Sequence, residues 1–484
     1  MARSACIHPH HREAVATALE RQGFLTQSSL AAYLGMSLST VNNFCRGLRV
    51  SVRKFEEICD ALELEAGPMT LPATAEVVAA EQASSPAAAA GFSAYDFAWV
   101  GRDELVADLS AKLQADCRLL LITGIAGVGK TALAERLARA LNATSSLIRI
   151  NFDHQEQTTD FSSVTARLLE QCGQVLSPED RQNPEQLARR LLVHLQDRNR
   201  LILIDSLEAL LIGDDDSGES QFQDAAYAAF FQSLLAAAAF QSRLILTSQE
   251  LPAQLLALGS RYQNFWHCAP LTGLSATEQL ALFEKVGFPV QSPSLDRTYL
   301  VRIGKAYEGH PLALRIITGE MGSRPFFGNV TAYWNRYGKE IEAVEQALAA
   351  AAAGELTGAD DKWALDRFTR ALRRNVRQRL EHTLQRLQRD ARLAYLLLCE
   401  AAVYRCPVPE DWWLTHLDYW NSDPDAQLAA IDALRDRYLV EEVLEDDEYR
   451  LKQHNLIRSV ALDHLDQLDL NPLPDSTVAD PDEA

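Results

Sequence analysis

Residues 119–131 read LLLITGIAGVGKT, a short apolar run followed by a glycine-rich loop that ends in Lys-Thr. The loop fits the full phosphate-binding pattern G-x-x-x-x-G-K-[ST]. Its glycines let the backbone turn tightly and aim N–H groups at phosphate oxygens, its lysine can neutralise the β- and γ-phosphates, and its threonine hydroxyl can bind Mg²⁺. The candidate phosphate- and magnesium-binding residues are Gly124, Gly127, Gly129, Lys130 and Thr131.

The segment after this loop predicts a helix. It reads ALAERLARAL and repeats apolar residues at Leu133, Leu137 and Leu141, which is a helical spacing. The loop therefore joins a strand to a helix whose N-terminal dipole faces the bound anion. Because Lys-Thr follows the glycines, the pattern favours a phosphate loop over a plain glycine turn. We expect this chain to bind a nucleoside di- or triphosphate.

Composition sets limits on the other functions of the chain. It has 484 residues, a formal net charge of −20 and a hydrophobic content of 47%, which is enough for several domains with their own cores. Such an acidic balance argues against non-specific binding of nucleic acid or anionic membranes by the whole molecule. No apolar run approaches the length of a membrane span, and the eight cysteines are scattered, as is typical of reduced thiols. We therefore expect a cytoplasmic protein without a membrane partner.

Strands and helices alternate between residues 119 and 269. This alternation predicts an α/β fold with a mostly parallel, doubly wound sheet. After about residue 270 the pattern becomes mostly helical, apart from a short hairpin expected at 438–454. The predicted strands of the parallel sheet are 119–123, 146–152, 201–205 and 243–248.

A second candidate magnesium ligand ends one of these strands. The stretch LILIDSLEALL at 201–211 is an apolar strand that ends in Asp205. A carboxylate beside a phosphate loop suits Mg²⁺, although a buried strand that ends in Asp is common on its own. Glu208 is a weaker candidate for a catalytic role, because a carboxylate in the turn after the strand can activate water only with the right geometry.

Further stretches occur in a recognisable order along the chain, and they resemble the NB-ARC class of STAND nucleotide switches. That class is known from plant disease-resistance proteins, apoptosome scaffolds and many bacterial regulators. The resemblance covers roughly residues 95–465 and lies in several separate motifs. Besides the phosphate loop and the Asp205 strand, these motifs are WVGRDELVADL at 99–109, SRLILTSQE at 242–250, PLTGLSATEQLALF at 270–283, GHPLALRI at 309–316 and QHNLIRSVA at 453–461.

The resemblance implies a multidomain architecture around an α/β P-loop NTPase core with a doubly wound parallel sheet. An all-α helix-turn-helix head would precede the core, and a helical arm and a winged helix would follow it. The Ala-, Pro- and Ser-rich stretch after the head predicts a flexible linker, and the acidic end predicts a disordered tail. The expected units are the head at 12–65, the linker at 66–94, the nucleotide domain at 95–270, the arm at 271–355, the winged helix at 356–465 and the tail at 466–484.

The resemblance also implies ligand contacts beyond the phosphate loop. Val100, Gly101 and Arg102 would line the adenine side, and Pro311 of the GxP motif would touch the base or ribose. His454 matches the histidine of the family's MHD motif, which reaches the β-phosphate of ADP and holds the closed state. The implied activity is a regulatory switch that is closed with ADP and becomes an open homo-oligomer with ATP, with Mg²⁺ accompanying the nucleotide.

Three positions depart from the family pattern. The acid that usually follows the strand aspartate is Ser206, the arginine expected at the end of the sensor strand is Gln249, and the Asp of MHD is Asn455. These differences predict slow or absent hydrolysis and leave nucleotide binding intact. They count against the alternative of an active AAA-like ATPase, which would need a water-activating acid and an arginine finger.

The N-terminal module has the spacing of a helix-turn-helix. In QSSLAAYLGMSLSTVNNFCR at 27–46, Ala31 would allow a close helix crossing, Gly35 would make the turn and Val41 would pin the second helix. Ser37 would cap that second helix. The side chains expected to point outward, where they could contact DNA bases and phosphates, are Ser39, Thr40, Asn42, Asn43 and Arg46.

The partner of this head stays open between DNA and protein. A helix-turn-helix DNA-binding transcription regulator gated by nucleotide is one reading, and a helical protein-interaction module is the other. The head carries about equal numbers of acidic and basic residues, which weakens the DNA reading. Elsewhere, the segment 363–392 interleaves many arginines with leucines at three- and four-residue steps, which predicts an amphipathic helix with a solvated polar face rather than a nucleic-acid surface.

Overall fold

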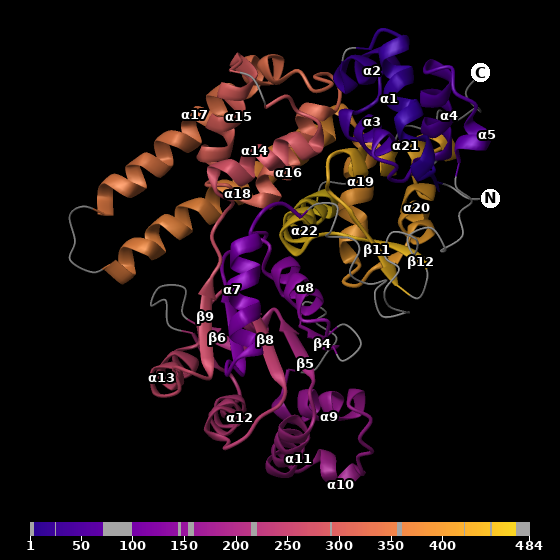
Figure 1. Cartoon of the computed structure of the whole chain (residues 1–484). Coiled ribbons are helices and arrows are strands. Elements are labelled where there is room, and N and C mark those ends of the chain that lie inside the picture. The colour runs from indigo at the N-terminus through magenta and orange to yellow at the C-terminus, as the bar shows by residue number, and fades with distance from the viewer. Residues whose placement is uncertain are drawn as a thin grey trace, which may run out of the picture.

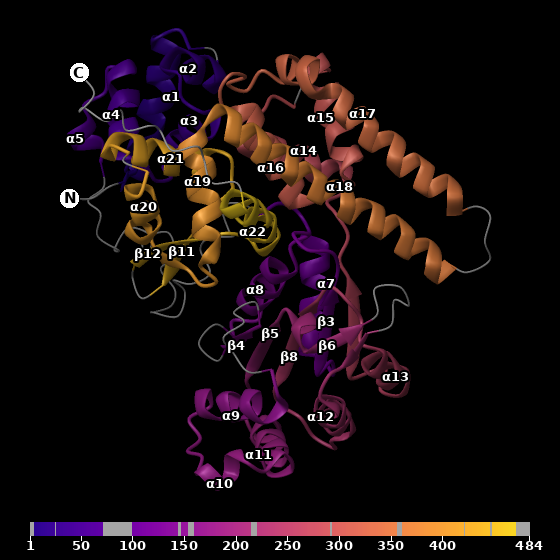
Figure 2. The same ribbon diagram turned by 180° about the vertical axis from the view of Figure 1, so that it is seen from behind.

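The computed structural model describes most of the chain, and the remaining segments include two of the expected units. The expected linker beyond Thr70 and the expected tail beyond Leu470 lie outside the described residues. Figures 1 and 2 show a sheet-containing part at the bottom and a larger helical part above it. The described residues are 4–24, 26–70, 99–143, 147–152, 159–213, 220–290, 293–355, 361–420, 422–445 and 448–470.

The lower part is built on a five-stranded sheet in the order β4-β5-β8-β3-β9. Every neighbouring pair in this sheet is parallel, which confirms the expected doubly wound α/β core. The fifth strand, β9, was not predicted, because its sequence WHCAP lacks a run of branched apolar residues. The strands are β3 (Leu119–Thr123), β4 (Leu147–Asn151), β5 (Leu201–Asp205), β8 (Arg243–Ser248) and β9 (Trp266–Pro270).

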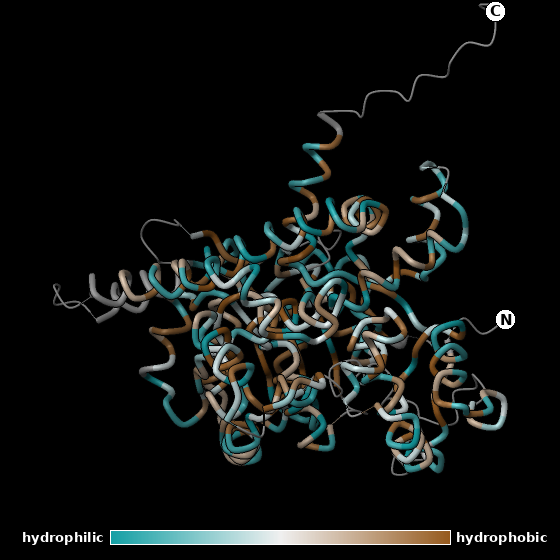
Figure 3. The backbone as a smooth tube through the Cα atoms, turned by 90° about the horizontal axis from the view of Figure 1, so that it is seen from above, coloured by the Kyte–Doolittle hydropathy of each residue, from teal (hydrophilic) through white to brown (hydrophobic). Residues whose placement is uncertain are grey.

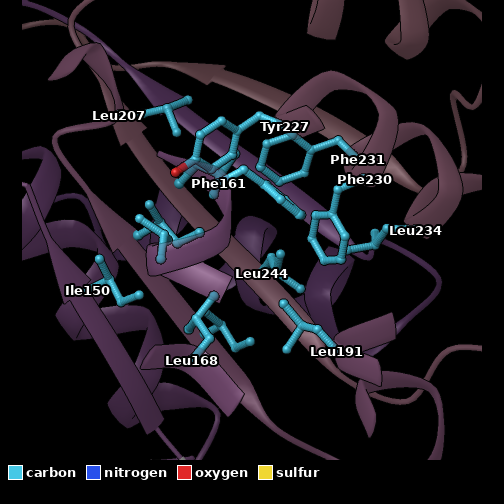
Figure 4. Packing of buried hydrophobic residues seen from close by; sticks show 14 of the residues in the cluster. Ile150, Phe161, Leu168, Leu191, Leu207, Tyr227, Phe230, Phe231, Leu234 and Leu244 are labelled. Atoms are coloured by element: carbon cyan, nitrogen blue, oxygen red, sulfur yellow. The ribbon is translucent and has the colours of Figure 1, made fainter. Parts of the chain in front are cut away.

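Helices cover both faces of the sheet, and each face has its own apolar core. In Figure 4 the aromatic side chains Phe161, Tyr227, Phe230 and Phe231 gather over one face. Helices α7 and α8 cover the other face. The elements around the sheet are α7 (Asp103–Gln114), α8 (Lys130–Ala140), α9 (Phe161–Gln171), α10 (Pro178–Arg181), α11 (Pro184–Asp197), η4 (Leu207–Leu210), β6 (Leu211–Gly213), β7 (Ser220–Phe222), α12 (Ala225–Ala236) and α13 (Ala253–Arg261).

The N-terminal unit folds around a separate core of short helices. Ala31 and Val41 are fully buried where α2 meets α3, and Gly35 ends α2 with a φ of 65°. The Ser37 hydroxyl accepts the N–H of Thr40 at 3.1 Å, so it caps α3 as expected. The elements are β1 (Ser4–Ala5), η1 (Pro9–His11), α1 (Arg12–Arg21), α2 (Gln27–Leu34), α3 (Leu38–Cys45), β2 (Val50–Ser51), α4 (Val52–Ala61) and α5 (Ala66–Met69).

Two further apolar clusters organise the part after the sheet. Along the tube in Figure 3, hydrophilic and hydrophobic colours alternate within helices, as expected for helices that bury one side. In Figures 1 and 2 the long helices α17 and α18 lie side by side and project away from the sheet. The helices of the first cluster, here called the arm, are α14 (Ala276–Val286), α15 (Leu295–Ala306), α16 (Pro311–Gly322) and α17 (Val330–Glu355). Helix α18 (Asp361–Asp390) contributes apolar residues to both clusters.

The second cluster, here called the C-terminal unit, combines helices with a small antiparallel sheet in the order β10-β12-β11. Strands β11 and β12 form the hairpin expected at 438–454. No helix in the described parts of the chain is both long enough and apolar enough to cross a bilayer. The elements are α19 (Arg392–Glu400), η5 (Ala401–Val403), β10 (Val408–Pro409), α20 (Glu410–Asp418), α21 (Pro424–Asp436), β11 (Glu441–Glu445), β12 (Glu448–Lys452) and α22 (Asn455–Leu470).

The arginine-rich helix α18 differs from its prediction of a solvated polar face. Arg379 is 1% exposed and forms ion pairs with Glu320 of α16, which Arg386 also contacts. Tyr333 of α17 adds its hydroxyl to the same network. Facing helices supply carboxylates to these arginines, so part of the polar side of α18 is buried between helices rather than solvated.

Candidate nucleotide-binding site

The phosphate loop lies between β3 and α8 and has the backbone that an anion cradle requires. Gly127 and Gly129 have φ angles of 79° and 99°, a backbone region that residues with a Cβ rarely adopt. Gly129 directly precedes α8, so the loop ends at a helix N-terminus with its free N–H groups. Lys130 donates to the carbonyl oxygens of Gly124 and Ile125 at 2.8 and 3.1 Å. These residues fit a polyphosphate.

Thr131 and Asp205, the predicted magnesium ligands, meet beside this loop. The Thr131 hydroxyl donates to Oδ1 of Asp205 at 2.9 Å, and the hydroxyl of Thr247 on β8 donates to the same oxygen. Asp205 is 1% exposed. Because Thr131 gives its hydrogen to the carboxylate, its oxygen keeps lone pairs for a metal ion. The arrangement fits Mg²⁺, which binds through a few protein oxygens and the phosphates of its nucleotide.

An arginine that the sequence reasoning did not select also holds this carboxylate. Arg149 of β4 donates from Nη2 to Oδ2 of Asp205 at 3.0 Å and from Nη1 to Glu135 of α8 at 2.7 Å. Burial raises the pKa of Glu135 to about 7, against the opposing effect of Arg149. The available signal was a single charged residue among the apolar residues of the strand LIRIN, which ends in Asn151.

The residues expected on the adenine side lie next to the loop. The backbone N–H of Arg102 donates to Glu278 at 2.5 Å, and its guanidinium donates to the carbonyls of Val128 and Thr272 at 3.0 and 2.9 Å. Gly101 has a φ of 63°, and a Cβ there would overlap the side chain of Glu278. Val100 packs against the apolar core of the arm. This segment therefore joins the phosphate loop to α14 of the arm.

The arm reaches the phosphate loop through a buried histidine beside the predicted Pro311. His310 is 1% exposed, and its Nδ1 accepts the N–H of Ala313 at 3.3 Å while Nε2 lies 2.9 Å from the carbonyl of Ala126 in the loop. These partners require a neutral ring with the hydrogen on Nε2. Burial lowers the pKa of His310 to about 4, and the nearby Lys130 contributes to the lowering. Pro311 itself is the first residue of α16.

The C-terminal unit approaches from the same side. His454 is close enough to His310 that a positive charge on its ring would lower the pKa of His310. Nδ1 of His454 accepts the N–H of Leu456 at 3.2 Å at the start of α22. Lys452, two residues earlier, lies close enough to Glu135 of α8 to affect its pKa. The nucleotide domain, the arm and the C-terminal unit thus meet around the phosphate loop.

Two positions that could support hydrolysis are arranged differently from an active ATPase. Glu208 accepts from the side-chain amide of Gln249 at 2.8 Å and from its backbone N–H at 3.1 Å, so both carboxylate oxygens are held. Ser206 adopts a left-handed backbone with a φ of 63° and donates its N–H to Thr247. Since the Glu208 carboxylate is occupied, it is poorly placed to accept a proton from water.

The head residues expected to point outward do not do so in this structure. Ser39, Thr40 and Asn42 are 2%, 4% and 6% exposed. Thr40 donates to the Asp436 carboxylate of α21 at 2.8 Å, and Asn42 donates to the carbonyl of Lys285 at 3.1 Å. The prediction of outward presentation is wrong for these residues because α3 packs against the arm and the C-terminal unit.

The other two residues of the set are only half-buried. Arg46 donates to the same Lys285 carbonyl at 3.1 Å, and Asn43 is partly exposed. A sequence cannot reveal such a contact, since the partners lie more than two hundred residues away along the chain.

Comparison with known proteins agrees with the nucleotide-binding fold. Residues 98–251 match the AAA ATPase domain family. This chain therefore carries a P-loop domain of the ATPase type, which is a coarser result than the expected NB-ARC class. An uncharacterized WD repeat-containing protein of Nostoc sp. is 30% identical over 234 residues, which are 46% of this chain and 17% of that protein. The chain thus spans less than a fifth of that relative's length.

Several solved structures are similar to parts of this chain. A STAND protein with a tetratricopeptide repeat sensor from Pyrococcus horikoshii matches with a TM-score of 0.42 and 16% identity, over 77% of this chain and 43% of that one. Cdc6p from Pyrobaculum aerophilum matches with a TM-score of 0.32 and 12% identity, over 76% and 96% of the two chains. The Orc1 protein of Aeropyrum pernix, solved in complex with DNA, matches with a TM-score of 0.32 and 14% identity, over 77% of this chain and 94% of that one.

Proposed function

We propose that this chain is an ATP/ADP-binding molecular switch of the STAND/NB-ARC class that acts in signal transduction. The observation that carries the proposal is the meeting of three parts at one phosphate loop. The loop and Asp205 would supply the phosphate and magnesium contacts, and His310 of the arm bonds to the loop backbone. Leu312 of α16 belongs to the apolar cluster of the C-terminal unit and lies directly against Gly127 of the loop, and His454 is close enough to affect the pKa of His310. A ligand bound in the loop would therefore be sensed by all three parts.

The closed, ADP-bound state is the conformation that we assign to these contacts. Arg102 and His310 both bond to backbone oxygens of the loop, so the arm and the segment before α7 hold the loop in one arrangement. In the proposed cycle, ATP favours an open form that assembles with further copies of this chain. Hydrolysis is slow or absent in the proposal, because Ser206 carries no carboxylate and Glu208 is held by Gln249.

The first test is the nucleotide that co-purifies with the protein. We expect wild-type protein to carry ADP, and Lys130→Ala to lose it while remaining folded. Lys112→Ala is a matched control, because Lys112 pairs with Asp108 on the surface of α7. Bound ADP should also stabilise the wild type by about 3 kcal/mol at a hundredfold excess over Kd. Absence of both co-purified nucleotide and any thermal shift with ADP or ATP would refute the switch.

The second test concerns the closed state. His454→Ala should speed release of ADP and promote ATP-dependent oligomers, since a lost charge-assisted contact costs about 1.5–3 kcal/mol. ADP dissociation rates and sedimentation velocity profiles report these two effects. An unchanged rate and an unchanged profile would show that His454 serves only packing at the start of α22.

A second candidate function is a nucleotide-gated regulator whose head contacts DNA. The observation that favours it is the chemistry that covers α3. Lys54 of the head lies 3.3 Å from Asp432 and from Asp436 of α21, and Thr40 donates to the latter. These carboxylates bind the Lys54 ammonium and the Thr40 hydroxyl, two groups that phosphates of DNA would otherwise contact. We propose that this surface is covered in the closed state and exposed when the switch opens.

Lys285 of α14 connects the segment beside the phosphate loop to the head. Lys285 at the end of α14 donates from Nζ to the carbonyl of Trp99 at 2.7 Å, and its own carbonyl accepts from Asn42 and Arg46. Trp99 directly precedes the segment that contacts the phosphate loop through Arg102. A rearrangement of this segment on nucleotide exchange would therefore act on the helix that holds the head.

The DNA proposal is tested with a variant that frees the head. The double substitution Asp432→Asn, Asp436→Asn in the full chain should increase binding to duplex DNA at low salt, and binding should weaken steeply as salt rises. Adding Arg46→Ala should reduce that binding for all sequences alike. If the freed variant and the ATP-loaded wild type both ignore random duplexes, the exposed surface of α3 is better assigned to a protein partner.

A further inference from the structure

One arginine joins two buried carboxylates beside the phosphate loop. Arg149 lies between the buried residues Ile148 and Ile150 on β4, and its side chain points toward β5 and α8. One nitrogen of its guanidinium donates to Asp205 and another to Glu135, at 3.0 and 2.7 Å. Because the guanidinium fork is planar and rigid, it fixes both carboxylates relative to each other.

This cluster sets two carboxylates against one guanidinium in a place with little water. Asp205 and Glu135 are 1% and 3% exposed, whereas Arg149 brings a single positive charge. Among the described residues, Oε2 of Glu135 has no hydrogen-bond partner. Lys452 of β12 adds a cation at longer range, and burial still raises the pKa of Glu135 to about 7. A change in the charge of Arg149 or Glu135 therefore acts on Asp205 with little screening by water.

The two oxygens of Asp205 have separate tasks. Oδ1 faces Thr131, the candidate magnesium ligand, and Oδ2 faces Arg149. A metal ion at the Thr131 side and the guanidinium at the other side can therefore act on one carboxylate at the same time. The positive guanidinium makes the electrostatic potential at Asp205 less negative, and this weakens the attraction of the carboxylate for the metal ion.

We propose that Arg149 is a positioning residue that sets how much Mg²⁺ the protein needs to bind nucleotide, by sharing the Asp205 carboxylate with the metal. The proposal rests on the nucleotide binding proposed above. Removing the charge of Arg149 leaves Asp205 more negative and should strengthen Mg²⁺ binding. Removing the charge of Glu135 lets Arg149 act on Asp205 alone and should weaken Mg²⁺ binding. Opposite signs from two neighbouring variants distinguish this role from simple structural support.

The experiment measures ADP affinity in the full chain as a function of free Mg²⁺, and the readout is the Mg²⁺ concentration that gives half of the full effect. Arg149→Met should lower this midpoint about tenfold, since a unit charge close to a divalent ion changes its binding by at least that factor even at the dielectric constant of water. Glu135→Gln should raise the midpoint when it is measured above pH 7, where the Glu135 carboxyl of the wild type is ionised. Arg149→Lys keeps the charge and should return the midpoint to near the wild-type value. Arg189→Met, on the exposed side of α11, is the matched control.

Each outcome decides between the two proposals. If the wild type fails to bind ADP, the proposed switch fails and the role of Arg149 falls with it. If the wild type binds ADP but the midpoints of Arg149→Met and Glu135→Gln stay the same or move in one direction, only the role of Arg149 is refuted. If Arg149→Met does not fold, Glu135→Gln and Arg149→Lys still decide, because a Glu135→Gln midpoint that does not rise overturns the proposal.

Discussion

His310 should make the protein lose stability in mildly acidic solution. Its Nδ1 accepts the N–H of Ala313 and its Nε2 donates to the carbonyl of Ala126, so both nitrogens of the neutral ring are used. A proton on Nδ1 would face another donor at the start of α16. Burial adds to this cost, and it lowers the pKa of His310 from 6.5 to about 4.

The sign and size of the effect follow from proton linkage. Unfolded chains bind a proton at a histidine near pH 6.5, whereas folded His310 stays neutral down to about pH 4. Between these values the unfolded state holds more protons, so the stabilisation is present above pH 6.5 and is lost as the pH falls toward 4. The loss amounts to about 2 kcal/mol at pH 5 and about 3 kcal/mol in full. For a cooperative unit of about 150–250 residues, ~2 kcal/mol lowers Tm by roughly 4–8 °C.

Calorimetric scans at about pH 7.5 and about pH 5 test this estimate. His310→Asn keeps a side-chain oxygen that can cap α16 but cannot titrate, so its Tm should fall less than that of the wild type over this range. His10→Asn, at an exposed position of the head, should behave like the wild type. Equal falls in Tm for the wild type and His310→Asn would refute the assignment of the acid sensitivity to this ring.

Three further predictions concern catalysis, the arm and the head. Steady-state ATP hydrolysis, followed by phosphate release, should stay near or below about one turnover per minute, and turnover near the usual ~10 s⁻¹ that Asp205→Ala abolishes would contradict this. Glu320→Gln removes the buried carboxylate that Arg379 and Arg386 share, leaves them only the half-buried Glu340, and should cost about 3–5 kcal/mol in unfolding experiments. Arg302→Gln, in a partly exposed ion pair, should cost less than about 1 kcal/mol. Amide hydrogens of Leu38–Cys45 should exchange faster with ATP than with ADP, and equal rates would argue against a head released by ATP.

Local sequence patterns predicted the parts of the site that lie close together along the chain. The phosphate loop follows from glycine spacing, and the strand ending in Asp205 follows from its apolar run. Their meeting at Thr131 could also be expected, because parallel strands bring their carboxyl ends to one edge of the sheet. The hairpin of β11 and β12 was predictable for the same reason, since its partners are neighbours in sequence.

The contacts that were missed all join segments far apart in the sequence. Nothing in GHPLALRI reveals that His310 will be buried against the loop at Ala126, because a histidine before a helix is usually read as a cap. Arg149 looks like a lone charge on a strand until Glu135 and Asp205 are seen on either side of it. The burial of Thr40 depends on Asp436, at the other end of the chain.

These contacts also define the free energy that a nucleotide must supply in the proposed switch. A ligand shifts a two-state equilibrium only by its difference in affinity for the two states, and full switching needs about 5.5 kcal/mol of such difference. The covered head contributes Thr40 and Lys54 bonds to Asp436 and two donors to the carbonyl of Lys285. At roughly 1 kcal/mol for each neutral bond and somewhat more for the charged ones, their sum is of the same size as that difference. These polar contacts are therefore within the range that one nucleotide can oppose, and the burial of Leu38 in the apolar core of the arm adds to what it must overcome.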